Sequence, residues 1–503
     1  MAMRTFSKSK LLALRQCPKR LWLEVHRPEL RADSAATESS FQVGHQVGDI
    51  ARRVYDPEET GELIDVNRDG FPAALARSFE LLSGRVSVFE AGFSAGGALA
   101  FADVLLPVAQ KKGKGSPDWA MIEVKSSASV KDYHRDDVAI QAYVARAAGV
   151  MLASVALAHI DSSWTYPGSG DYQGLLKLND LTEEAEARAP EVQAWIAQAQ
   201  TVCASPVEPV DTIGAHCDIP YACGFYTYCG RNEPQAEFPV AWLPYIGVKA
   251  QQLALQGVIE LQDVPDGLLN ARQQRVKDHT LAQTVYFDAA GAAADLAVHQ
   301  LPAYFLDFET IQFAVPIWKG TRPFQQNSFQ FSLHRLGSTG TLTHTEFLDL
   351  SGGDPAEPFA LALVAACGKK GPVYVYNAGF ETARINELAA RFPQLSITLL
   401  AINARVVDLL PIARERYYHP SQQGRWSIKK VLPAVVPELR YDQLDGVKDG
   451  GMAMEAFLEA IHPETPPQRK EQIGQQLLAY CKLDTYAMVR LWQVFAGRMD
   501  LAL

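Results

Sequence analysis

The sequence predicts an α/β protein with two domains joined by a helical spacer. The chain has 503 residues, which is too long for one ordinary hydrophobic core. Strand-like apolar runs alternate with helical patterns in two separate stretches. Between these stretches lies a segment that is rich in Gln and Ala and helical in pattern. We therefore expect domains at residues 1–235 and 301–503, with the spacer at 236–300.

Composition places the chain among globular proteins, with 48% hydrophobic and 21% charged residues. The N-terminus lacks the apolar run of a secretory signal, and no segment reaches about 18 uncharged apolar residues. We expect a cytoplasmic protein with no membrane partner, whose seven cysteines are metal ligands or buried thiols. The net charge of −10 disfavours most nucleic-acid partners but not nucleases, whose carboxylates hold cations.

The first domain begins with a helical segment that Pro18 should interrupt, followed by a helix in "FQVGHQVGDIARRVY". Two apolar runs separated by a Gly-rich turn predict a hairpin between Val86 and Leu106. The next strand is "WAMIEVKSS", and the helix "DDVAIQAYVARAAG" follows and ends at Gly149. These elements form the α/β pattern of the domain.

Two carboxylates and a lysine stand on neighbouring strands of this predicted sheet. Asp103 is near the end of one strand, and Glu123 and Lys125 are two residues apart on the next, so their side chains share a face. Facing carboxylates repel unless a cation lies between them, which makes the pair a natural Mg²⁺ or Mn²⁺ site. A lysine there can position water and stabilise charge on a phosphate. Surface charges at a sheet edge also show this spacing.

Further polar side chains lie in elements around the pair. Glu90 is in the preceding strand, Gln141 and Tyr143 are in the following helix, and His45 is in the earlier helix. A lone histidine in such a helix is also typical of a hydrogen-bonded core residue.

Together these residues resemble the PD-(D/E)XK nucleases of the RecB-like group, which includes CRISPR-associated exonucleases. The resemblance covers about residues 6–230 and implies a PD-(D/E)XK nuclease fold. Ala102 stands where the proline of the family name is expected. The resemblance implies three sets of residues. Asp103, Glu123 and Lys125 would be catalytic, with the two carboxylates as metal ligands. Glu90 and His45 would be further metal ligands, and Gln141 and Tyr143 would be substrate-binding residues.

Three cysteines, Cys217, Cys223 and Cys229, stand at even spacing in "HCDIPYACGFYTYC". In the nuclease group that the domain resembles, one upstream cysteine and three downstream cysteines hold an iron-sulfur cluster, which makes Cys17 the fourth ligand of a 4Fe-4S cluster. Two alternatives remain: a zinc site with Cys17 or His216 as the fourth ligand, and buried thiols without a metal. The other cysteines, which have no partner at metal spacing, are expected in the core: Cys203, Cys367 and Cys481.

The second domain starts with the strand "AYFLDFET", in which Asp307 and Glu309 share one face. In the last helix Tyr480 and Asp484 are four residues apart and also share a face. Between them "YNAGFE" places Glu381 at the start of a helix. Carboxylates that converge from such elements are best explained by two divalent cations about 3.5 to 4 Å apart, and Tyr480 can then orient a water.

This set resembles the DnaQ-like 3′-5′ exonucleases of the DEDD type that carry tyrosine in the third motif. The resemblance covers about residues 301–500 and implies an RNase H-like exonuclease fold. It implies that Asp307, Glu309 and Asp484 are metal ligands and that Tyr480 orients water. Glu381, which we expect in the catalytic set, stands where aspartate is usual. Asp408 is a candidate substitute ligand or a helix cap.

A basic and aromatic stretch, "GRWSIKKVLP", contains Trp426, Lys429 and Lys430. Both lysines are candidate substrate-binding residues, because phosphates and bases suit such a combination, although a solvated loop would look the same. The resulting hypothesis is a metal-dependent nuclease that hydrolyses DNA, single-stranded or with free ends, in repair or in defence against foreign DNA. The alternative is a nucleic-acid-binding scaffold with one or both nuclease domains inactive. The sequence identifies no protein partner.

Overall fold

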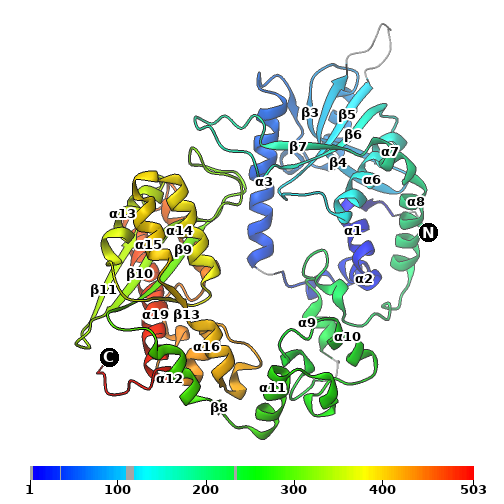
Figure 1. The fold of residues 1–503 in the computed structure, drawn as a ribbon. Helices are drawn as coiled ribbons and strands as arrows, with labels where there is room; N and C mark the ends of the chain where they lie inside the picture. Colours follow the sequence, from blue (N-terminus) through cyan, green and yellow to red (C-terminus); the bar gives the residue numbers. More distant parts are fainter. Residues whose placement is uncertain (1–3, 34, 109–117, 232–234, 503) are drawn as a thin grey trace. The chain divides into compact units, whose positions relative to one another are not determined.

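The computed structural model describes residues 4–33, 35–108, 118–231 and 235–502, and it confirms the α/β class (Figure 1). The chain forms two compact units. The N-terminal unit comprises residues 1–234 and Phe313–Phe324, and the C-terminal unit comprises Gln235–Gln312 and Gln325–Leu503. The segment expected to be a spacer therefore belongs to the C-terminal unit. Across the described residues, no helix has the length and apolar character needed to cross a membrane.

A mixed sheet forms the centre of the N-terminal unit. Its strands follow the order β2-β3-β4-β5-β6-β7, and β1 pairs in parallel with β4. The β3-β4 hairpin turns at Gly96 and Gly97, which both have positive φ, the conformation that glycine tolerates best. The strands are β1 (Phe6–Ser7), β2 (Glu62–Leu63), β3 (Val88–Ala95), β4 (Ala98–Val108), β5 (Asp118–Lys125), β6 (Leu152–Ile160) and β7 (Leu176–Asp180).

Helices cover both faces of this sheet. Met121 of β5 belongs to the same buried cluster as Val138 of α6, whereas Val124 of β5 belongs to a cluster with Val47 of α3. Successive strand residues point to opposite faces, so β5 contributes to both layers. The helices are α1 (Lys8–Gln16), α2 (Pro18–His26), α3 (Ala35–Tyr55), α4 (Val66–Asp69), α5 (Phe71–Leu81), α6 (Asp132–Ala147), α7 (Thr182–Ala187), α8 (Ala189–Ala204) and α9 (Tyr226–Gly230).

The C-terminal unit contains a sheet in the order β11-β10-β9-β12-β13, antiparallel across the first three strands and parallel across the last three. A short second sheet pairs β8 with β14. The strands are β8 (Tyr286–Phe287), β9 (Ala303–Ile311), β10 (Asn327–Leu336), β11 (Leu342–Leu348), β12 (Val373–Val375), β13 (Val406–Asp408) and β14 (Tyr417–Tyr418).

The two faces of β9 have different neighbours. Leu306 and Phe308 pack into an apolar cluster with residues of α13, α14 and α15. The opposite face meets α19, where Phe305 contacts Trp492. The helices are α10 (Val248–Leu255), α11 (Ala271–Ala282), α12 (Ala289–Ala297), α13 (Ala356–Ala366), α14 (Gly379–Arg391), α15 (Pro393–Asn403), α16 (Leu409–Arg416), α17 (Ile428–Val435), α18 (Gly450–Ile461) and α19 (Pro467–Phe495).

Candidate functional site

Asp103 and Glu123 face each other across β4 and β5. The antiparallel register pairs Val104 with Ile122, which places Asp103 opposite Glu123. The backbone N–H of Val124 donates to Oδ2 of Asp103 at 2.7 Å. Burial and the neighbouring charge of Glu123 raise the pKa of Asp103 well above its ordinary range. The N-terminal unit thus holds two carboxylates whose charges repel each other.

Two lysines and a further aspartate surround Glu123, which is 1% exposed. Lys125 Nζ lies 2.5 Å from Oε1 of Glu123 and 2.5 Å from Oδ2 of Asp137. Lys8 Nζ lies 2.9 Å from Glu123 and 3.1 Å from Asp137. Burial alone would lower the pKa of each lysine, but the two carboxylates raise both pKa values above the ordinary range. Both ammonium groups are therefore charged in this site.

Gln141 and Tyr143 occupy different surroundings, although both belong to α6. Nε2 of Gln141 donates to Glu123 at 2.5 Å and to Asp137 at 3.0 Å, so Gln141 belongs to the carboxylate cluster. Tyr143 instead packs against the β3-β4 turn, where its hydroxyl lies 2.9 Å from an ideal Cβ position on Gly96. The structure does not bring Tyr143 into the cavity that the carboxylates line.

Glu90 and His45 line that cavity, whose volume is about 650 Å³. Glu90 is exposed, and its φ of 56° is unusual for a residue within a strand. Although much of its surface is exposed, partial desolvation of its carboxylate and the charge of Glu123 raise its pKa, whereas Lys8 and His45 oppose the rise. Gly44 and Gly48 of α3 lie on the same wall, where an added Cβ would meet open space. The cavity is therefore open beside the carboxylates.

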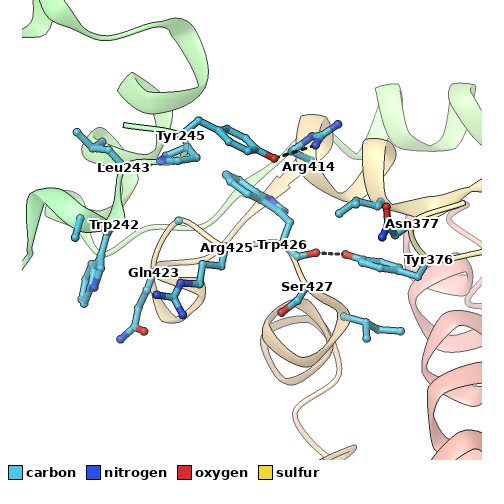
Figure 2. Close-up of a pocket in the computed structure, with 15 residues that line it drawn as sticks. Trp242, Leu243, Tyr245, Tyr376, Asn377, Arg414, Gln423, Arg425, Trp426 and Ser427 are labelled. Carbon is cyan, nitrogen blue, oxygen red and sulfur yellow. Dashed lines mark hydrogen bonds between the residues drawn. The ribbon is translucent and has the colours of Figure 1, made fainter. Parts of the chain in front are cut away.

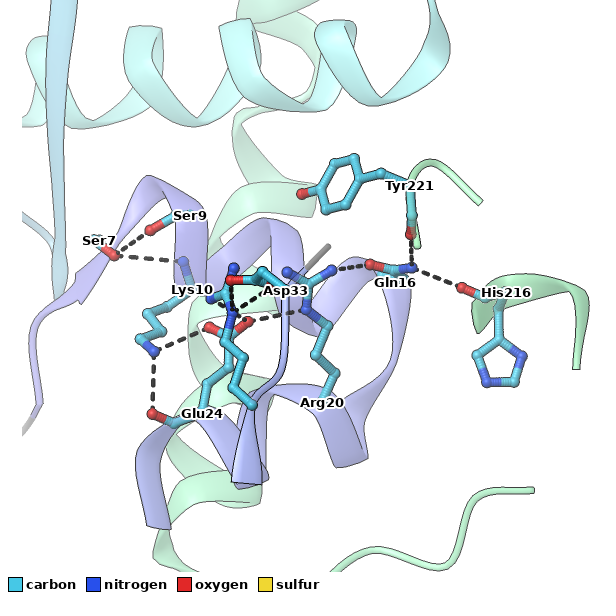
Figure 3. Close-up of polar contacts among 10 residues, drawn as sticks. Ser7, Ser9, Lys10, Gln16, Arg20, Glu24, Asp33, His216 and Tyr221 are labelled. Carbon is cyan, nitrogen blue, oxygen red and sulfur yellow. Dashed lines mark hydrogen bonds and ion pairs between the residues drawn. The ribbon is translucent and has the colours of Figure 1, made fainter. Parts of the chain in front are cut away.

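The four cysteines predicted as ligands line a single small cavity, to which Cys17, Cys217, Cys223 and Cys229 all contribute. The α1-α2 segment holds the downstream cysteine loop in place. Nε2 of Gln16 donates to the carbonyl of His216 at 2.8 Å and to that of Tyr221 at 2.9 Å (Figure 3). These bonds join segments about two hundred residues apart in sequence. All four thiols are free.

The sulfur atoms of the four free thiols are not as close together as in a zinc site. A tetrahedral zinc with Zn–S bonds of about 2.3 Å places sulfur atoms roughly 4 Å apart. Within the described part of the chain, no three of these sulfurs lie within 4.8 Å of one another. Burial raises the pKa of Cys223 and of Cys229, while Arg20 and Lys19 oppose these increases. Four free thiols with basic side chains nearby are a donor set that either an iron-sulfur cluster or a structural zinc ion takes.

Asp307 and Glu309 converge in the C-terminal unit with a cysteine that was expected only in the core. Ligand atoms of Asp307, Glu309 and Cys481 lie within 4.8 Å of one another. Sγ of Cys481 is 3.8 Å from Oδ2 of Asp307, and the cysteine is fully buried. Burial, followed by the charge of Asp484, raises the pKa of Glu309 to about 8 and that of Asp307 well above its ordinary range. β9 therefore presents two mutually repelling carboxylates to α19.

Asp484 lies beside this pair on α19 and is 5% exposed. Burial raises its pKa to about 6, while Tyr441, Lys429 and Tyr480 limit the increase. The hydroxyl of Tyr441 donates to Oδ1 of Asp484 at 2.5 Å. Tyr480 is buried, and its ring lies 6.3 Å from that of Tyr441. The spacing of one helical turn between Tyr480 and Asp484 was predictable from sequence, whereas the contact of Tyr441 was not.

Glu381 and Asp408 differ in the hydrogen bonds that their carboxylate oxygens accept. Glu381, in the first turn of α14, is 2% exposed, and its Oε2 is buried without a hydrogen-bond partner. Burial raises its pKa to about 8, and it contributes to the raised pKa values of Asp307 and Glu309. Asp408 accepts hydrogen bonds from Leu410, Asn377 and Ala378 backbone N–H groups. The structure thus favours a capping role for Asp408.

Lys429 and Lys430 point to different neighbours. Lys429 Nζ lies 5.0 Å from the centroid of the Tyr480 ring and 5.5 Å from that of Tyr441, at the carboxylate site. Lys430 Nζ lies 3.5 Å from Oε1 of Gln423. Trp426 is 6% exposed, which leaves little of its ring available for stacking with a base. Only Lys429 therefore lies beside the carboxylates.

Several residues at the two sites were not identified from sequence: Lys8, Asp137, Cys481 and Tyr441. Asp137 precedes Gln141 by one helical turn, and Cys481 lies one turn before Asp484, so helical spacing could have indicated both. Lys8 and Tyr441 come from distant elements and carry no such signal.

The family comparison covers part of the C-terminal unit. A family described as a domain of unknown function, DUF2779, matches residues 304–427. This range includes Asp307, Glu309 and Glu381 but not Asp484. No curated protein matches the chain.

Proposed function

We propose that the protein is a metal-dependent nuclease that hydrolyses phosphodiester bonds of DNA at two centres. The observation that carries the proposal is the convergence of Asp307, Glu309 and Asp484, which are distant in sequence, on one face of β9 with Tyr480 beside them. Buried carboxylates that repel one another are costly without a cation. The RNase H-like and PD-(D/E)XK folds remain part of this proposal.

In the C-terminal centre, Asp307, Glu309 and Asp484 would hold the divalent cations, Mg²⁺ or Mn²⁺. When bound, such ions supply an activated water and stabilise the leaving oxygen. Tyr480 orients the attacking water, and Lys429 supplies positive charge beside the carboxylates. The unpartnered Oε2 of Glu381 gives this centre a further acceptor.

In the N-terminal centre, Asp103 and Glu123, with Glu90 and His45 at the cavity wall, would hold the cation. Lys125 stabilises negative charge on the phosphate, while Gln141 orients Glu123. Tyr143 packs elsewhere, and we therefore give it no role in this centre.

Cys17, Cys217, Cys223 and Cys229 would hold a 4Fe-4S cluster. Four protein ligands leave no open coordination position, so the group is structural. It would fasten the α1-α2 segment to the downstream loop, which the hydrogen bonds of Gln16 already join. We assign the protein to DNA processing in the cytoplasm, in repair or in defence against foreign DNA.

The test is to assay Asp103→Asn and Asp307→Asn separately and together on single-stranded and double-stranded DNA with Mn²⁺. We expect each single variant to reduce the rate of hydrolysis at its own centre by a factor of about 10² or more. The double variant should be inactive. Asp263→Asn, an exposed aspartate of the C-terminal unit, is the matched control.

If neither single variant changes degradation by an active wild type, both assignments fail. A wild type that binds DNA but does not hydrolyse it would instead support the scaffold alternative.

A further inference from the structure

A cavity of about 620 Å³ lies within the C-terminal unit, on the side of β12 where the chain enters α14 (Figure 2). Trp242 and Tyr245, from the segment expected to be a spacer, form one wall. Arg414, Arg425 and Asn377 belong to the other walls. The volume falls in the range of small-molecule sites, which is about 300 to 1,000 Å³.

The walls are held together by specific backbone contacts. Gly424 has a φ of 70°, and a Cβ added there would lie 1.6 Å from the carbonyl oxygen of Trp242, so only glycine allows this approach. Nε2 of Gln273 donates to the carbonyl of Pro244 at 2.9 Å. The hydroxyl of Tyr376 donates to the carbonyl of Trp426 at 2.6 Å. These contacts hold the walls of the cavity in fixed positions within the unit.

The charged side chains that line the cavity are both arginines, and no acidic residue is among its lining residues, all of which the structure describes. Nε of Arg414 is buried and has no hydrogen-bond partner. A guanidinium terminal nitrogen of Arg414 lies 3.4 Å from the hydroxyl of Tyr245, and the two side chains point toward each other in Figure 2. Arg425 is exposed. This arrangement suits an anion, and guanidinium groups match phosphate in geometry.

An aromatic surface stands beside these charges. The side chain of Tyr245 is 80% exposed, and its φ of 55° is uncommon for a bulky residue. Asn377, on another wall, has a φ of 81°. Residues held in such conformations cluster at binding sites. An exposed tyrosine ring next to arginines can stack with a base while the guanidinium groups bind a phosphate.

The cavity is contiguous in sequence with the proposed catalytic elements. Asn377 is followed by the first turn of α14, which carries Glu381. Ser427, which also lines the cavity, precedes α17, which carries Lys429 beside Tyr480. The cavity therefore adjoins, at the starts of α14 and α17, the two helices that carry Glu381 and Lys429.

We propose that this cavity binds one nucleotide of a single-stranded substrate, with its base on Tyr245 and its phosphate on Arg414 and Arg425. The inference rests on the proposed nuclease function and adds a substrate class to the C-terminal centre. A free mononucleotide has the same chemistry, so the test must separate it from a strand.

The experiment measures binding of a fluorescently labelled oligothymidylate to the full chain in EDTA, where hydrolysis is absent. We expect Tyr245→Ala and Arg425→Ala each to weaken binding about tenfold, the scale of one stacked base. Arg425→Ala should also reduce the slope of log affinity against log salt by about 0.7. Arg414→Lys keeps the positive charge but loses the planar guanidinium group. It should weaken binding by a smaller factor than the two alanine variants. Arg469→Ala, which alters a partly exposed arginine of the same unit paired with Glu459, is the matched control.

Melting temperatures establish that each variant is folded, and the exposed positions of Tyr245 and Arg425 make this the expected result. An ultraviolet crosslink from an iodouridine oligonucleotide to Trp242 or Tyr245 would support the site independently. Unchanged oligonucleotide binding in Tyr245→Ala and Arg425→Ala, or a wild type that does not bind at all, would overturn the inference.

Thymidine monophosphate is the second probe. If both variants weaken its binding but leave oligonucleotide binding unchanged, the cavity takes free nucleotides and the strand proposal is wrong. Retained hydrolysis by Asp307→Asn in an Asp103→Asn background would refute the C-terminal nuclease centre without affecting the binding result.

Discussion

The hydroxyl of Tyr441 donates a hydrogen bond of 2.5 Å to Oδ1 of Asp484. Asp484 lies on α19, and Tyr441 comes from the short segment between α17 and α18. The bond fixes one oxygen of the carboxylate, and Tyr441 itself is buried, with 7% of its surface exposed. A distant tyrosine thus sets the orientation of a proposed metal ligand.

Tyr441→Phe removes this donor without changing the shape of the ring. We expect the Mn²⁺ concentration for half-maximal hydrolysis to rise on the order of tenfold in an Asp103→Asn background, because hydrogen bonds to charged groups contribute about 1.5 to 3 kcal/mol. Tyr417→Phe is the control, since it removes a buried hydroxyl that donates to Ala434 in the same unit. Equal metal dependence in both variants would exclude an orienting role for Tyr441.

Lys8 is predicted to be as important as Lys125 for the N-terminal site. Lys8→Gln leaves Glu123 and Asp137 with Lys125 as their remaining ammonium partner, so we expect a lower melting temperature and at least about tenfold slower hydrolysis in an Asp307→Asn background. Lys10→Gln is matched, because Lys10 lies on the same helix and pairs with Glu24 at 2.9 Å (Figure 3). Wild-type rates in Lys8→Gln would show that Lys125 alone suffices.

The proposed 4Fe-4S cluster predicts the colour of the purified protein. Protein purified without oxygen should be brown and contain about four iron and four sulfide ions per chain. Cys223→Ser should lose the colour and lower the melting temperature, because a four-ligand site contributes to folding. Cys203→Ser, which alters a buried cysteine in the main core of the N-terminal unit, should keep the colour. A colourless wild type that contains zinc would instead establish the zinc alternative.

Metal removal should expose the repulsion among the carboxylates of β9 and α19. In EDTA, we expect Asp307→Asn to melt at a higher temperature than the wild type, because the amide is neutral, whereas Asp307 must either carry a charge beside Glu309 and Asp484 or bind a proton. Added Mn²⁺ should raise the wild-type melting temperature by several degrees and that of Asp307→Asn by less. Asp263→Asn should follow the wild type in both conditions. An equal Mn²⁺ effect in Asp307→Asn would place the ion elsewhere.

The lowered pKa of His334 predicts that the protein loses stability in acid. Burial, followed by the charges of His344 and Lys482, lowers the pKa of His334 from 6.5 to about 3. Its Nδ1 lies 2.8 Å from Oγ1 of Thr485 on α19. Below pH 6.5 the unfolded chain binds a proton at this histidine and the folded chain does not. The contribution of His334 to the free energy of unfolding is therefore complete above pH 6.5 and is lost as the pH falls toward 3.

His334→Gln cannot be protonated, so its melting temperature should depend less on pH between 7 and 4. His462→Gln, at an exposed position, should keep the wild-type slope. Parallel melting curves for wild type and His334→Gln across that range would show that other groups control acid unfolding.

Local spacing predicted the residues that share a face. Asp307 and Glu309 are two apart on a strand, and Glu123 and Lys125 follow the same rule, which depends only on the backbone geometry of a strand. The four-residue spacing of Tyr480 and Asp484 likewise places both on one side of α19. The α/β class and the break at Pro18 were also predictable, since Pro18 begins α2.

Tertiary packing decided which of these faces meet and which outside residues join them. Lys8 reaches Glu123 only because β1 pairs with β4 and positions α1, and Tyr441 reaches Asp484 only through the packing of α17 and α18 against α19. The residues at 236–300 carry no motif, yet Trp242 and Tyr245 form a wall of the arginine-lined cavity. By itself the sequence determined the periodic placement of side chains within each element, because that placement follows from backbone sterics. The partners across elements were decided by the folded structure alone, because they depend on how distant segments bury their apolar faces together.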